Sequence, residues 1–170
     1  MTIRTDYTDA EWDLLTDLPR MAAFGAMAAE DGGPVTSTRE LWASMMELAQ
    51  AARSRYPDNA LIQEVTRAIT QPEDDDEMPM TGWKPNSGAE LGEAMVAKTL
   101  QTAPRVREIV ASQATPEEGA EYTAWVLGIA RAGCQAARGG LFGLSGNPMT
   151  AAEDQYIKDL TAALGAERVA

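Results

Sequence analysis

Apolar residues recur along most of this chain at spacings of three and four, the spacing of one face of an α-helix. Leu41, Met45 and Leu48 form one such face, and Tyr122 with Val126 begins another. We find no convincing run of alternating apolar and polar residues of the kind that half-buried strands show. The pattern therefore predicts an all-α protein.

Helix starts are marked by five capping boxes, in which a Ser or Thr is followed three residues later by Glu. We expect Pro19 to interrupt the first helical run, leaving one segment from about residue 9 and another over 19–29. A separate helix is expected after Pro104. The total is about seven helices. The five boxes pair Thr8 with Glu11, Ser37 with Glu40, Ser87 with Glu90, Thr115 with Glu118, and Thr150 with Glu153.

The chain divides into two similar halves within a single all-helical domain, 1–170. An acidic linker at 71–86, with three prolines and five consecutive acids, separates halves of about 8–70 and 87–166. Each half predicts a small-residue helix, a glycine break and a capped helix that folds back as a hairpin. The paired segments are Ala28-Ala29 with Ala136-Ala137, Gly32-Gly33 with Gly139-Gly140, and Pro34 to Thr36 with Pro148 to Thr150.

The helix before each glycine break carries small residues on one face. Ala22 and Gly25 lie on the first helix, and Gly128 and Gly133 on the second. Small residues allow close approach of two backbones, so we expect these helices to cross at the centre of the fold. The alternative left open is that the small residues accommodate bulky neighbours such as Trp125.

Composition narrows the range of functions. Fourteen Lys and Arg against 26 Asp and Glu give a net charge of -12, which disfavours nucleic acid and anionic membranes as partners. The chain has no His, which removes His-based catalysis and His-ligated metals, and its single Cys134 cannot form an intrachain disulfide. Without an apolar signal segment or membrane span, we expect a cytoplasmic protein. The sequence does not predict the oligomeric state.

Two windows, about 21–54 and 124–165, resemble the tellurite-resistance TerB-like family. The likeness rests on an Asp-Gly turn after an alanine-rich helix, followed by a capped amphipathic helix, in each half. Asp31-Gly32 matches the first turn, although Arg39 stands where an acid is expected. Glu153 matches the second turn, although Gly146 replaces its aspartate. The resemblance implies about seven helices, a role in metal and stress responses, and acidic turn residues as cation ligands.

Two groups of residues are therefore candidate sites. Glu30, Asp31 and Glu40 could hold a cation, although we expect Ca²⁺ or Mg²⁺ to bind only weakly and no other cofactor to bind. The apolar loop residues Leu141, Phe142 and Leu144 cover the core or contact a protein partner. The sequence thus predicts a non-enzymatic interaction or stress-associated module. An acidic metal-binding protein or a carboxylate-based metal enzyme is the alternative.

Overall fold

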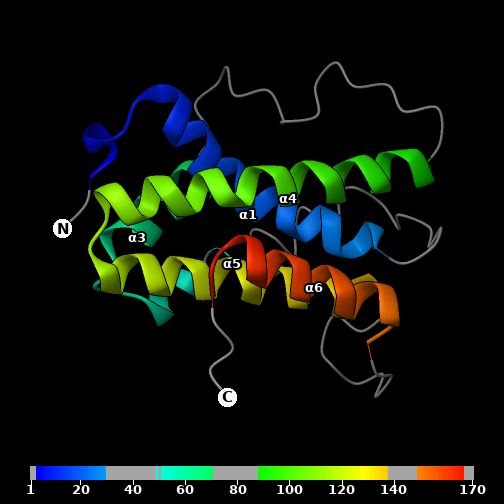
Figure 1. Cartoon of the computed structure of the whole chain (residues 1–170). Helices are drawn as coiled ribbons and strands as arrows, with labels where there is room; N and C mark the ends of the chain where they lie inside the picture. The colour runs from blue at the N-terminus through cyan, green and yellow to red at the C-terminus, as the bar shows by residue number, and fades with distance from the viewer. Residues whose placement is uncertain (1–2, 30–48, 50, 71–87, 138–148, 167–170) are drawn as a thin grey trace.

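The computed structural model describes residues 3–29, 49, 51–70, 88–137 and 149–166. These residues form helices and no strand, which confirms the predicted all-α class (Figure 1). Residues 49 and 51–55 are also helical. The helical elements are the 3-10 helix η1 (Arg4–Asp6), α1 (Asp9–Ala28), α3 (Ala60–Thr70), α4 (Gly88–Gln113), α5 (Pro116–Ala137) and α6 (Ala151–Ala163).

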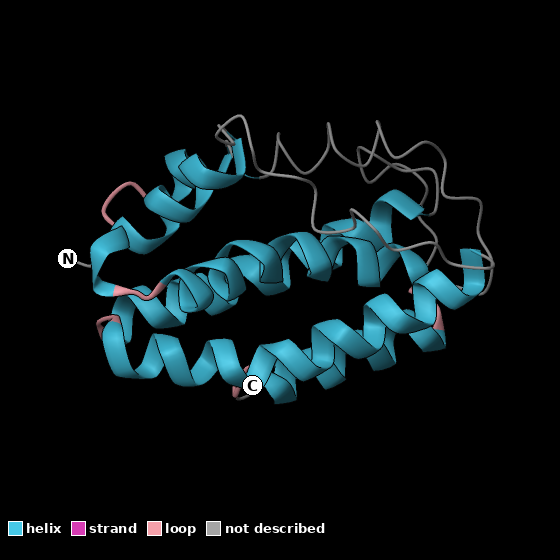
Figure 2. Cartoon of the chain, turned by 90° about the horizontal axis from the view of Figure 1, so that it is seen from above, coloured by secondary structure: helices cyan, strands magenta, loops and turns pink. Residues whose placement is uncertain are grey.

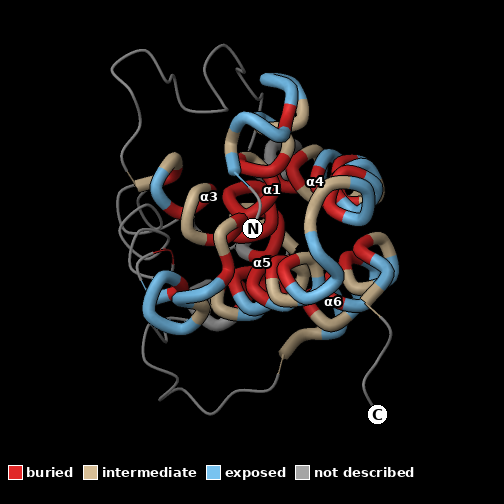
Figure 3. Tube along the Cα trace, turned by 90° about the vertical axis from the view of Figure 1, so that its left-hand side faces the viewer, coloured by how far each residue is buried: buried red, intermediate tan, exposed pale blue. Residues whose placement is uncertain are grey.

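Helix α1 lies at the centre of the described fold, with α3, α4, α5 and α6 around it (Figure 3). Helix α4 runs antiparallel to it, because the Thr99 hydroxyl lies 3.1 Å from the Met21 carbonyl while the Gln113 amide donates to Glu11 at 3.1 Å. Burial between several helices explains why the later part of α1, residues 21–28, contains no charged residue.

Small residues do bring α1 and α5 together at Gly133, as predicted. A Cβ atom added to Gly133 would lie 2.9 Å from the Ala23 carbonyl oxygen and 2.9 Å from the Ala26 Cβ. The two helices therefore touch where only a glycine fits.

The prediction for Gly25 is wrong, because a Cβ there would lie 2.6 Å from the Tyr156 hydroxyl oxygen of α6 and 3.3 Å from Thr99 Oγ1 of α4. The prediction for Gly128 is wrong as well, since this residue is exposed and a Cβ there would meet nothing within 4 Å. Gly128 lies on the face of α5 that is turned away from α1. Gly133, five residues further along the helix, lies on the face that contacts α1.

The predicted break at Pro19 is also wrong, because α1 runs unbroken through this buried residue. In an α-helix the N–H of residue 19 would bond the carbonyl of Leu15, and proline has no N–H. The structure supplies another donor for this carbonyl. The hydroxyl of Tyr122, on α5, donates to the Leu15 oxygen at 2.7 Å. A side chain from another helix thus satisfies the acceptor that proline leaves open.

Pro104 likewise lies inside a helix, so the predicted separate helix after it is the second half of α4. Tertiary contacts on both sides of the proline hold the helix together. Before it, Gly92 packs so closely on α1 that a Cβ would be 2.9 Å from that of Ala28. Ala103, directly before it, and Val106, two residues beyond it, are fully buried in the core. Packing along the whole length of α4 therefore outweighs the local preference of proline for a helix end.

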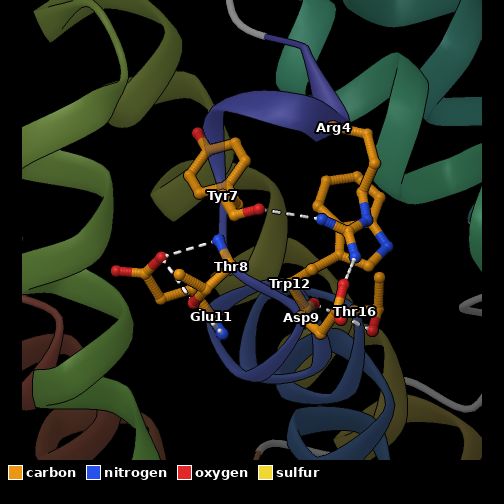
Figure 4. Close-up of polar contacts among 7 residues, drawn as sticks. All are labelled: Arg4, Tyr7, Thr8, Asp9, Glu11, Trp12 and Thr16. Atoms are coloured by element: carbon orange, nitrogen blue, oxygen red, sulfur yellow. Dashed lines mark hydrogen bonds and ion pairs between the residues drawn. The ribbon is translucent and has the colours of Figure 1, made fainter.

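Three of the five predicted capping boxes are confirmed, at the starts of α1, α5 and α6. Figure 4 shows the first, in which the Glu11 N–H donates to Thr8 Oγ1 at 3.3 Å and the Thr8 N–H donates to Glu11 Oε2 at 2.9 Å. The Thr8 N–H and the Thr8 hydroxyl both donate to the Glu11 carboxylate, and these two hydrogen bonds lower the pKa of that carboxyl. The Arg4 guanidinium lies 5.2 Å from the Trp12 ring centre and forms an ion pair with Asp9, and the three side chains can be followed in the same view.

The remaining sequence predictions on organisation fall outside the described residues. These are the first glycine break and the Ser37 box, the acidic linker at 71–86, and the loop of the second hairpin at 138–148. Ser87, which begins another of the boxes, also lies outside them. The hairpin of the first half therefore stays a prediction. In the second half, the structure shows the capped start of α6 at Thr150.

Candidate functional site

A broad groove runs along the side of α5 that faces away from α1. Its volume is about 1560 Å³, and α5 forms its floor. Residues 51–56 form one wall, while α6 and the last turns of α4 form the other. In Figure 2, the described residues are seen from above as helices joined by loops, with no strand. The groove exceeds the roughly 300–1,000 Å³ of most small-molecule pockets, and its length follows the helix axis.

The floor of this α5 groove consists mainly of small side chains. Ala120, Ala124 and Gly128 follow one another at steps of four residues, so they share one face of the helix. All three are exposed. Leu127 and Trp125 lie at the edge of the same face and are nearly buried. The floor is therefore shallow, mostly apolar, and open to close approach by another backbone.

Trp125 packs against the aromatic ring of Tyr122. Its ring stands edge-on to Tyr122, with ring centres 5.9 Å apart and an interplanar angle of 69°. Tyr122 in turn is fixed by its hydrogen bond to α1. The side of the groove floor is thus anchored to the central helix through two aromatic rings.

The charges that line the groove are mostly positive. Arg55, Arg107, Arg131 and Lys158 line it, against one carboxylate, Asp154. Lys158 and Asp154 form an ion pair within α6. Within the described part of the chain, no carboxylate lies in ion-pair distance of the three arginines. A chain of net charge -12 therefore carries a locally basic groove.

A smaller cleft of about 760 Å³ continues from one end of the groove and has the opposite charge. Glu117, Glu118 and Glu121, at the start of α5, line it together with Asn59 and Glu64. Asn59 is buried and caps α3 by accepting the Ile62 N–H at 2.9 Å. Its amide also donates to the Glu118 carbonyl and to a Glu121 carboxylate oxygen, at 3.1 and 2.8 Å. These contacts give the cleft a structural role, joining α3 to α5.

The structure does not test the site residues predicted from the sequence. Glu30, Asp31 and Glu40 are outside the described residues, and so are Leu141, Phe142 and Leu144. Glu153, which matched the second turn of the resemblance, is described. It is fully buried, and it accepts the Thr150 N–H at 2.8 Å as the carboxylate of a capping box. Across the ranges that the structure describes, no three Asp, Glu or Cys residues gather in a way that could hold a metal ion.

Sequence reasoning missed the groove and its arginines. The one available signal was the step of four residues between Ala120, Ala124 and Gly128, which marks a small-residue face. The arginines gave no signal, since they come from three separate helical segments and nothing in the local pattern places Arg55 near Arg107. The strongest pKa shifts lie elsewhere. Burial raises the pKa of Tyr122 and of Tyr156, both of which donate to carbonyls of α1 in the core.

Comparison with protein-family models, with curated proteins and with solved structures finds no match to this chain. The TerB-like resemblance therefore stays a prediction. Among the helices of the described residues, none has the length and apolar character that crossing a membrane requires.

Proposed function

We propose that this protein is a non-enzymatic interaction module and that the α5 groove is its binding surface. The observation that carries the proposal is the exposed row of Ala120, Ala124 and Gly128 between two helical walls. An exposed helix face made of small residues contributes little to the stability of its own fold. It allows a second helix to pack at short range.

The chemistry of the lining agrees with binding rather than catalysis. The polar side chains are arginines, Lys158, threonines, Tyr56, Trp125 and one carboxylate, Asp154, which is already ion-paired. Acid–base catalysis by carboxylates needs such a group placed at a reacting atom with a pKa suited to the task. The described lining offers cations and apolar surface, which position and attract a partner.

Metal binding, the alternative from the sequence, keeps no specific observation in its favour. Its candidate ligands Glu30, Asp31 and Glu40 lie outside the described residues. The association with stress responses rests on the family resemblance alone. Both stay predictions, and the groove supports a role in protein interaction without them.

A display selection tests the proposal. Helical peptides of about 16 residues, long enough to span the floor, would be selected on the wild-type protein. Their binding would then be compared with Ala124→Trp, which fills the groove, and with Ala97→Trp, an exposed position on α4 outside it. We expect peptides that bind the wild type and Ala97→Trp equally, and Ala124→Trp at least about tenfold more weakly. If no selected peptide distinguishes the two variants, the groove is not a binding surface.

A further inference from the structure

The charge of the groove is opposite to the charge of the protein. Arg55, Arg107 and Arg131 line it without a carboxylate partner among the described residues, although acids outnumber bases 26 to 14 in the chain. Together with Lys158, they give the described lining four cations against one carboxylate, that of Asp154. This lining is complementary to a negatively charged occupant.

These arginines lie along the length of the groove. Arg55 lies near the first turn of α5, because it also lines the smaller cleft with Glu117 and Glu118. Arg131 lies on α5 itself, about 15 residues beyond its start, which corresponds to roughly 22 Å along the helix axis. Arg107 lies on the α6 side, where its Cδ is 2.9 Å from the position of a Cβ on Gly165. The positive charges thus flank the floor on both sides and toward both ends.

The floor between them fits a helix better than an extended peptide. Its exposed small residues, Ala120, Ala124 and Gly128, recur at the spacing that lets two helices interlock. An extended peptide that binds by strand addition would need the edge of a sheet, and the described residues contain no strand. The walls are helical as well, so an inserted helix would pack against helices on three sides.

We infer that the occupant is an acidic amphipathic helix of another protein, with a narrow apolar face on the floor and carboxylates toward Arg55, Arg107 and Arg131. This inference rests on the proposed function. It adds the secondary structure and the sign of the charge of the partner. A second copy of this chain is the competing occupant, and its docking would show as self-association.

The same peptide selection, with the charge made the variable, provides the test. The library has a fixed Ala and Leu face, and every flanking position is encoded as Glu or Lys at equal frequency. Only peptides that lose affinity for Ala124→Trp are counted. Affinities are then measured for Arg107→Glu/Arg131→Glu and for a matched control, Arg105→Glu/Lys98→Glu, at exposed α4 positions outside the groove lining.

We expect Glu to predominate in the groove-dependent peptides and their affinity to fall as salt is raised. The Arg107→Glu/Arg131→Glu variant should bind them about tenfold more weakly, and the control within about twofold. The groove variant should in turn select Lys-rich peptides. Groove-dependent peptides that are neutral or Lys-rich on the wild type would overturn this inference and leave the proposed function standing. An absence of groove-dependent peptides would overturn both.

Sedimentation of the protein alone tests whether a second copy of this chain occupies the groove. We expect a monomer whose sedimentation is unchanged by Ala124→Trp. A dimer that Ala124→Trp dissociates, and Ala97→Trp does not, would assign the groove to a second copy of this chain and refute the inference.

Discussion

The Tyr122 hydroxyl should stabilise α1 because Pro19 removes a backbone donor from it. Tyr122→Phe deletes the hydrogen bond to the Leu15 carbonyl, 2.7 Å away, and leaves a buried oxygen without the donor that an ordinary helix supplies. Leaving a buried acceptor unsatisfied costs about 1–3 kcal/mol, so we expect a loss of about 2 kcal/mol in the free energy of unfolding. The ring itself remains, so the packing against Trp125 is kept.

Tyr156→Phe provides the matched control. Its hydroxyl also donates to a carbonyl of α1, that of Ala22 at 3.1 Å. Residue 26 is an alanine inside α1, so its N–H remains as the helical donor to this carbonyl. Loss of the hydroxyl then removes only an additional hydrogen bond. We expect a cost of about 1 kcal/mol, at the ordinary net value of one hydrogen bond.

A double-mutant cycle tests the link to proline directly. In a Pro19→Ala background the alanine N–H can bond the Leu15 carbonyl, so the cost of Tyr122→Phe should fall to about 1 kcal/mol. The coupling free energy between the two sites is then about 1 kcal/mol. Urea unfolding at constant slope measures all four proteins. Equal costs of Tyr122→Phe in the two backgrounds would refute the reasoning, because the hydroxyl would then contribute independently of the proline.

Three further predictions follow from the same contacts. Gly133→Ala should cost about 2 kcal/mol, since its Cβ meets α1 at 2.9 Å, whereas Gly128→Ala should stabilise the protein by about 0.5 kcal/mol; equal effects in urea unfolding would contradict the packing. Thr150→Ala should lower the free energy of unfolding by about 1 kcal/mol through loss of the α6 cap, and an unchanged melting temperature would rule this cap out. Above pH 10 the unfolded chain releases the protons of Tyr122 and Tyr156 while the folded protein keeps them, so stability should fall with rising pH by about 1.4 kcal/mol per pH unit for each residue. Unfolding measured from pH 9 to 11.5 should show a smaller slope in Tyr122→Phe, and an unchanged slope would exclude this residue as its source.

The sequence by itself determined the helical class and most helix starts. Periods of three and four require only that one face of each helix be buried, whatever buries it. The capping boxes of Thr8, Thr115 and Thr150 are local as well, because each hydroxyl and its partner Glu lie within one turn. Local chemistry of this kind is readable from neighbouring residues alone.

Only the tertiary structure decided whether the prolines end their helices and which glycines lie at contacts. Pro19 continues α1 because Tyr122, far along the chain, supplies the missing donor to Leu15. Gly133 contacts α1 and Gly128 does not, since the inner face of α5 is chosen by its neighbours.

The groove also depends on the tertiary structure. The small residues of its floor follow one another in the sequence of α5, but its arginines come from separate segments whose proximity depends on how the helices pack. A local pattern records which face of a helix is apolar or small. It does not record which distant side chain will lie opposite that face, because that choice is made by the packing free energy of the whole fold.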